Sequence, residues 1–224
     1  MFRNDDKASH CRECGARIGW NACRRRGCSR RSHCLHKWWG AKTTSIVFIQ
    51  GAGTGAREAD VELARSLVAE LGDEFSVDFP TMPDEETPDY EHWRVPIGDA
   101  IARATAPVVV VGHSLGGYFL VRYLSSEEVE PPIAAVCIIA APFPSGDAAW
   151  VFEGFELPDR FGERLPKGAA VLLYASEDDD IIPFAHRDLY AAAIPGALTR
   201  TTFGGHQLGN DLAMVADDIR RIVS

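Results

Sequence analysis

The chain has 224 residues, of which 46% are hydrophobic and 25% are charged, and its formal net charge is −9. These values are typical of a folded globular protein and exclude an intrinsically disordered chain, while 20 glycines and 13 prolines without a repeat period exclude a collagen-like one. No apolar run reaches the roughly 20 residues that a membrane-spanning helix needs, and the N-terminal segment lacks the apolar stretch of a secretory signal peptide, so we expect a cytoplasmic protein without a membrane partner.

Residues 1–43 differ in charge from the rest of the chain. They hold 11 Lys and Arg against 3 Asp and Glu, a net charge of +8, and the total of −9 therefore leaves −17 for residues 44–224. An acidic body of this kind argues against nucleic acid or an anionic membrane as the main partner. Five of the six cysteines also lie in the first segment: Cys11, Cys14, Cys23, Cys28 and Cys34.

The spacing Cys11-x2-Cys14, with further cysteines and histidines nearby, invites a zinc-binding interpretation, because zinc takes thiolates and imidazoles at short spacing. A zinc ribbon needs a second close pair after a longer gap, and the segment has none. It also has too few aliphatic residues to build a core. We therefore predict a domain at 44–224 and an extension at 1–43 that is disordered or non-native. The alternatives are a zinc site, a redox tail, or a zinc-dependent nucleic-acid binder.

From residue 44 onward, short apolar runs alternate with segments of helical period. The runs predict six strands at residues 45–50, 76–79, 107–111, 133–139, 170–174 and 198–202. They are nearly all apolar, as expected for parallel strands that are buried on both faces. We therefore predict an α/β fold with about six mostly parallel strands and helices on both faces, which places the functional loops at the carboxyl edge of the sheet.

The helices follow from apolar residues at spacings of three and four. Leu67 and Leu71 belong to the first, and Trp93 and Ile97 to the second, where Pro96 predicts a kink or a late start. In the last helix Asn210 is a plausible N-cap. The apolar face of this last helix holds Leu212, Val215, Ile219, Ile222 and Val223.

Two connections are long. Residues 81–90 are rich in Pro, Asp and Glu and predict a surface loop. Residues 141–167 hold many aromatic side chains for a connector, among them Trp150, Phe152 and Phe155. These side chains either line a pocket or simply cover the sheet, and the sequence supports both interpretations equally.

The sequence Gly112-His113-Ser114-Leu115-Gly116 follows a buried valine run and precedes a helical stretch. It matches the G-x-S-x-G nucleophile elbow, in which a tight strand-to-helix turn needs glycine on both sides and lifts the serine above the sheet. Ser114 is thus the predicted nucleophile. The N–H of Leu115, at the start of the helix, is a predicted oxyanion donor.

A nucleophilic serine needs a base and an orienting acid, which follow it in chain order in this architecture. His206 lies after the sixth strand and is the predicted base, whereas His92, His113 and His186 are interpreted as structural or surface residues. The acid lies after the fifth strand, where four acids are consecutive, and Asp178 and Asp179 are the candidates. A cation site in this run is disfavoured, because four neighbours in one turn cannot all face one ion.

The loop after the first strand reads Gln50-Gly51-Ala52-Gly53-Thr54-Gly55. Its glycines allow close approach of the backbone to a ligand, and the Ala52 N–H is the predicted second oxyanion donor, with Gly53 next. A dinucleotide site is disfavoured, because the third glycine of that fingerprint and its ribose-binding acid are missing.

These motifs together resemble the α/β-hydrolases, and more narrowly the small serine hydrolases typified by retinoblastoma-binding protein nine. The resemblance covers residues 44–224 and rests on residues 49–53, 82–84, 112–117, 176–183 and 205–206. It implies a reduced hydrolase sheet without the first antiparallel hairpin, a short lid, and an acid at Asp179. One departure is Gln50-Gly51, where many α/β-hydrolases carry His-Gly.

The resemblance implies a serine esterase without a metal or other cofactor. Ser114, His206 and Asp179 are the expected catalytic residues, Leu115 and Ala52 the oxyanion donors, and Gly53, Trp150, Phe152 and Phe155 the substrate-binding residues. We expect small to medium carboxylic esters as substrates, because the lid is short. An acyltransferase, an amidase and a non-catalytic binding protein with the same fold are the alternatives.

Overall fold

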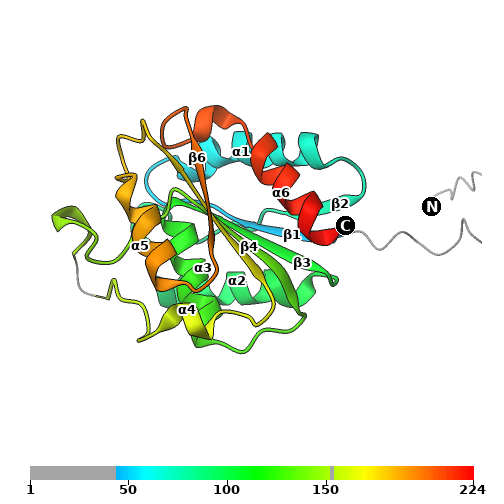
Figure 1. The fold of residues 1–224 in the computed structure, drawn as a ribbon, viewed down its shortest axis with the longest axis horizontal. Coiled ribbons are helices and arrows are strands. Elements are labelled where there is room, and N and C mark those ends of the chain that lie inside the picture. The colour runs from blue at the N-terminus through cyan, green and yellow to red at the C-terminus, as the bar shows by residue number, and fades with distance from the viewer. Residues whose placement is uncertain (1–43, 152–153) are drawn as a thin grey trace, which may run out of the picture. The chain divides into compact units, whose positions relative to one another are not determined.

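The computed structural model describes residues 44–151 and 154–224 (Figure 1). The extension at 1–43, with its possible zinc ligands, and the predicted pocket residue Phe152 lie outside the described residues. Six strands form one sheet in the order β2-β1-β3-β4-β5-β6, and every neighbouring pair is parallel. The strands are β1 (Thr44–Ile49), β2 (Phe75–Asp78), β3 (Val108–His113), β4 (Ile133–Ile139), β5 (Ala170–Ser176) and β6 (Leu198–Thr202).

Helices cover both faces of this sheet, which confirms the predicted fold (Figure 1). On one face lie α1 (Ala56–Leu71) and α6 (Ala213–Val223). The other face is covered by α2 (Tyr90–Arg103), α3 (Ser114–Ser126), α4 (Phe161–Arg164) and α5 (Ala185–Ala193). Two short 3-10 turns, η1 (Ala148–Trp150) and η2 (Leu208–Asn210), lie in the connections before α4 and α6.

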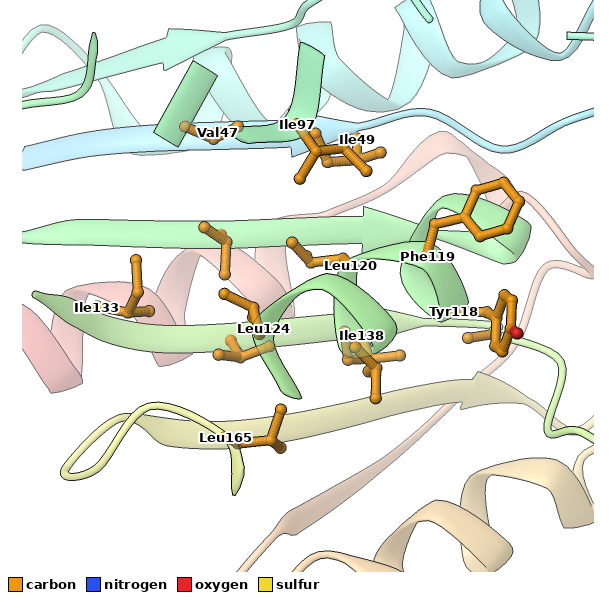
Figure 2. Close-up of a cluster of buried hydrophobic side chains, with 14 of the residues drawn as sticks. Val47, Ile49, Ile97, Tyr118, Phe119, Leu120, Leu124, Ile133, Ile138 and Leu165 are labelled. Carbon is orange, nitrogen blue, oxygen red and sulfur yellow. The ribbon is translucent and has the colours of Figure 1, made fainter. Parts of the chain in front are cut away.

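The core is built from the alternation of strand side chains. In β3, Val108 and Val110 join the cluster beneath α2 and α3, while Val109 and Val111 join the cluster beneath α1 and α6. All four are fully buried, which explains why the strand is an unbroken valine run. Figure 2 shows the first cluster, where Leu120 and Leu124 of α3 lie over the sheet.

The two uncertain points in the helices are resolved by the structure. The helix α2 begins at Tyr90, where the Asp89 side chain caps the His92 N–H, so the late start is wrong and Pro96 lies inside the helix. The N-cap prediction at Asn210 is also wrong. Asn210 has a left-handed φ of 57° within η2, and α6 begins at Ala213.

The reason for the second correction lies in the buried side chain of Leu208. It anchors η2 in the core, so the chain makes one extra turn before α6. The amides at the start of α6 are then satisfied by side chains other than that of Asn210. Asp211 accepts the Ala213 N–H at 2.9 Å, and Ser66 accepts the Leu212 N–H at 2.9 Å.

None of the helices within residues 44–151 and 154–224 has the length and apolar character needed to cross a membrane. The parallel strands end at one edge of the sheet, and the loops after β1, β3, β5 and β6 meet there. The predicted catalytic residues and oxyanion donors lie at this edge, in these connections or at the start of α3, whereas Trp150 and Phe155 lie in the connector after β4.

Candidate active site

Ser114 stands at the junction of β3 and α3 with a φ of 51°, a left-handed conformation that non-glycine residues rarely adopt. The turn is too tight for side chains on either side. A Cβ atom on Gly116 would lie 1.9 Å from the Gln50 oxygen, and one on Gly112 would lie 2.6 Å from the Gly117 Cα. The glycines are therefore required by close packing, and the strained serine is held at the carboxyl edge of the sheet.

His206 and Asp179 come from the loops after β6 and β5. The Nδ1 of His206 lies 2.9 Å from Asp179 Oδ2, and the other carboxylate oxygen accepts the N–H groups of Ile181 and Ile182 at 2.8 and 2.9 Å. Burial raises the pKa of Asp179, but the hydrogen bonds from His206 and the two amides outweigh it and lower the pKa overall. The ionised carboxylate accepts a hydrogen bond from the Nδ1–H of His206, which leaves Nε2 as the basic nitrogen.

Asp178 has a different set of contacts. Its Oδ1 accepts the N–H groups of Gly204 and Gly205, both at 3.0 Å, and the Ser176 hydroxyl at 2.9 Å. The Gly205 amide, followed by the Ser176 hydroxyl, lowers the pKa of this carboxyl. Asp178 therefore fixes the backbone just before His206, and Asp179 is the acid that contacts the imidazole.

Ser114 and His206 line the same cavity, which has a volume of about 410 Å³. Within the described residues, no hydrogen bond joins the Ser114 hydroxyl to His206. Serine–base contacts are often loose before a substrate binds. Ala52, Gly53, Leu115 and Trp150 also line this cavity.

The loop after β1 is held in place by Glu85, from the long connection that follows β2. The Gly53 N–H donates to the Glu85 carbonyl at 2.6 Å, and the Glu85 carboxylate accepts the N–H groups of Gly55 and Arg57. The N–H of Gly53 is thus occupied and cannot serve as the alternative oxyanion donor. Gln50 stands where many α/β-hydrolases carry the histidine of His-Gly. Its buried side chain donates to the Glu85 carboxylate at 2.9 Å, so it has a structural role.

The two predicted oxyanion donors remain available in the part of the chain that the structure describes. The Ala52 N–H has no acceptor there. The Leu115 N–H lies in the first turn of α3, where a helix offers no acceptor four residues earlier. Both residues border the cavity beside Ser114. The loop after β1 and the first turn of α3 can therefore each present one amide to a developing oxyanion.

The predicted lid residues lie on two neighbouring cavities. Trp150 borders the cavity of Ser114 and a second one of about 590 Å³, whereas Phe155 borders only the second. Phe155 is buried and packs on Tyr118 with ring centroids 4.1 Å apart. The aromatic connector thus contributes both to the core and to the cavities.

Among residues 44–151 and 154–224, none of the other three histidines offers a free base to the cavity, although His113 borders it. His92 is exposed on α2. His186 is buried; its Nδ1 accepts the Phe143 N–H at 2.8 Å and its Nε2 lies 3.1 Å from Asp147 Oδ2, which ties the connector to α5. His113 is buried against Asp60.

Sequence reasoning missed Asp60 and Glu85. Asp60 is fully buried on α1, in line with Leu63, Ala64 and Leu67 on the face that packs on the sheet. An acid on an apolar helical stripe is a signal that the sequence did contain, because a buried charge needs a partner. Glu85 has no such signal, because it stands in an acidic loop. Among the described residues, no group of three or more His, Cys, Asp or Glu side chains is arranged to hold a metal ion.

Comparison with known proteins gives the family and the fold. The profile of the alpha/beta hydrolase family matches residues 46–223. No curated protein matches the sequence significantly. Among solved structures, the ydeN gene product from B. subtilis superposes with a TM-score of 0.65 and 22% identity, covering 81% of this chain and 99% of that one.

Two further structures illustrate the range of similar proteins. The esterase domain of a Rhodothermus marinus protein matches with a TM-score of 0.55 and 20% identity, over 81% of this chain and 88% of that one. Alpha/beta hydrolase domain-containing protein 10 from mouse matches with a TM-score of 0.53 and 18% identity, over 82% of this chain and 92% of that one. At these identities the likeness establishes the fold alone.

Proposed function

The chain belongs to the alpha/beta hydrolase family, and we propose that it is a serine hydrolase that cleaves small to medium carboxylic esters through an acyl-enzyme. The observation that carries the proposal is the His206–Asp179 hydrogen bond of 2.9 Å on the same cavity as the strained Ser114. A binding protein has no need of a tautomer-fixed histidine on the same cavity as a serine at a strand-to-helix turn.

The chemistry follows from these positions. His206 Nε2 takes the proton of the Ser114 hydroxyl as its oxygen attacks the ester carbonyl. The N–H groups of Leu115 and Ala52 stabilise the tetrahedral oxyanion. The imidazolium then gives its proton to the leaving alcohol, and the acyl group stays on Ser114. A water molecule, deprotonated by His206, repeats the attack and releases the carboxylic acid, while Asp179 holds the histidine throughout.

The substrate size is inferred from the two cavities. Volumes of about 410 and 590 Å³ fall within the range of small-molecule sites. Leu115, Trp150 and Pro88 border both cavities, so an ester bound at Ser114 in the first cavity can extend toward the second. The esterase among the structural neighbours supports this reaction class. The narrower likeness to the retinoblastoma-binding protein nine type stays a prediction.

The test is hydrolysis of p-nitrophenyl esters from acetate to decanoate by the wild type and by Ser114→Ala. We expect the rate to be highest for short and medium chains and to fall to background in the variant. Matched anilides and added alcohols distinguish an amidase or an acyltransferase from an esterase. A folded wild type that turns over none of these compounds would refute the proposed function and favour a binding protein.

A further inference from the structure

A second buried histidine–aspartate pair lies directly behind the proposed catalytic one. His113 precedes the nucleophile, and its side chain and that of Asp60 are each only 1% exposed. The ring centroids of His113 and His206 are 4.8 Å apart. Neither residue takes part in the catalytic steps of the proposed mechanism.

The contacts of His113 define its charge. Its Nε2 lies 3.0 Å from the His206 carbonyl oxygen, which can only accept, so this nitrogen donates. Its Nδ1 lies 2.9 Å from Asp60 Oδ1 and 3.0 Å from Oδ2. The Asp60 oxygens also accept from the Gly51 N–H and the Gln207 side-chain amide. Burial raises the pKa of Asp60, but His113 and these hydrogen bonds lower it overall, which favours an ionised carboxylate that accepts from Nδ1. With an acceptor facing each nitrogen, the geometry favours the imidazolium form of His113.

The Asp60 carboxylate connects three loops of the site. It accepts the Gly51 N–H at 2.6 Å, next to the proposed oxyanion donor Ala52. It accepts Gln207 Nε2 at 3.2 Å, next to His206. Through His113 it also reaches the His206 carbonyl and the turn that carries Ser114. The loops after β1, β3 and β6 are thus joined at one buried ion pair.

We propose that the Asp60–His113 ion pair is a positioning element of the active site, which holds the backbone of His206 and the loop before Ala52 in the geometry that ester hydrolysis needs. This inference rests on the proposed function, because it assigns His206 and Ala52 their roles. Neither Asp60 nor His113 touches the reacting atoms. Their effect is on placement, and a displacement of about 1 Å at such a site costs about 100-fold in rate.

A consequence for pH follows. Each ring nitrogen of His113 faces an acceptor. When His113 loses a proton, one of these two hydrogen bonds therefore loses its donor. The charged groups that face His113 are Asp60 from α1 and Asp179 from the loop after β5, and the neighbouring ring is His206. Burial lowers the pKa of His113, but the Asp60 charge and its hydrogen bond outweigh it and raise the pKa above the ordinary 6.5. We therefore expect an alkaline decline in kcat that begins above that value.

The experiment compares His113→Phe, Asp60→Asn and the wild type on the best ester. In His113→Phe we expect kcat to fall about 10- to 100-fold with KM within about twofold. The hydrogen bond to the His206 carbonyl is lost, while a ring of similar size still borders the cavity at this position. In Asp60→Asn the amide can donate to Nδ1 of a neutral His113, whose Nε2–H still holds His206. This variant should lose less activity than His113→Phe and should lack the alkaline decline.

The control is Tyr174→Phe, which deletes another buried hydrogen bond, to Asp218 on the face of α6. It should lose stability and keep the wild-type kcat and pH profile. A folded His113→Phe with wild-type kcat, or one whose loss matches that of Tyr174→Phe, would overturn the inference. If His113→Phe does not fold, Asp60→Asn and its pH profile decide the question.

A readout that needs no activity separates this inference from the proposed function. Nitrogen NMR of the His113 ring in the wild type should show both nitrogens protonated at neutral pH, and the His206 amide signal should shift in Asp60→Asn. A neutral His113 ring would refute the ion pair. An inactive wild type with the imidazolium intact would refute the proposed function and, with it, any placement role in hydrolysis.

Discussion

Two histidine–aspartate pairs lie side by side in this molecule, and they differ in what the second ring nitrogen meets. In both pairs Nδ1 lies within 3.0 Å of a carboxylate oxygen. The Nε2 of His206 has no protein acceptor among the described residues, whereas that of His113 faces a carbonyl oxygen at 3.0 Å. The free nitrogen makes His206 a candidate base, and the occupied one makes His113 a fixed donor.

A third histidine completes the comparison. His186 accepts the Phe143 N–H at Nδ1, so its Nε2 carries the proton toward Asp147 and the ring is neutral. All three histidines stand next to an aspartate, yet their contacts define a base, a cation and a neutral clamp. A histidine–aspartate contact alone therefore says little about function, and the partner of the other nitrogen decides it.

The largest expected effect comes from breaking the His206–Asp179 pair. Asp179→Asn should lower kcat by about 10³- to 10⁴-fold, because an amide favours the wrong tautomer of the base. Asp178→Asn makes the same chemical change one residue earlier and should cost about tenfold or less, because Asp178 contacts backbone amides. Steady-state kinetics of both variants checks this, and equal losses would contradict the assignment of Asp179.

The next largest effect is a loss of stability when the His113–Asp60 pair is broken. Removing one partner of a buried ion pair costs about 3–5 kcal/mol, so His113→Phe and Asp60→Leu should each lower the free energy of unfolding by that amount. The double variant should regain part of it, because no charge is left unpaired. Urea unfolding of the three variants measures this coupling, and strictly additive losses would argue against an ion pair.

The same pair predicts the pH dependence of stability. The lowered pKa of Asp60 gives stability that is present above pH 3.8 and lost as pH falls through the folded value. The raised pKa of His113 gives stability that is present below pH 6.5 and lost as pH rises through its folded value. Stability should therefore be greatest between the acid limit set by Asp60 and the alkaline limit set by His113. In the double variant the losses on both sides should be smaller. Unfolding curves measured across this pH range check both expectations.

The smallest effect concerns the neutral clamp. His186→Phe removes a buried acceptor of the Phe143 N–H and should cost about 1–3 kcal/mol of stability. Because the clamp anchors the connector that carries Trp150, KM should rise a few-fold while kcat stays within about twofold. Thermal unfolding and ester kinetics measure both quantities. A fall in kcat as large as that of His113→Phe would contradict the different roles given to His186 and His113.

Local patterns in the sequence were sufficient for much of this architecture. The valine run of β3 and the glycines around Ser114 are short-range signals, and the structure has the strand, the turn and the helix at these residues. The choice between Asp178 and Asp179 was not local. It depended on a family resemblance, because only the fold determines which of two adjacent carboxylates meets His206.

The remaining features depend on contacts between distant residues. Asp60 meets Gln207 from 147 positions away, and Glu85 meets Gln50 across 35 positions, so no spacing rule reveals either contact. The Asn210 cap was wrong for a similar reason, because the burial of Leu208 decides where α6 begins. Propensity describes a segment, whereas these positions are determined by what packs against it.

The most direct test of the central claim is labelling with a fluorophosphonate probe, followed by mass spectrometry of the modified peptide. An activated serine reacts and carries the phosphonate, and an ordinary serine does not. We predict a single label on Ser114 in the wild type, its loss in Ser114→Ala, and much slower labelling in Asp179→Asn. A folded wild type that stays unlabelled, or a label on another residue, would contradict the account.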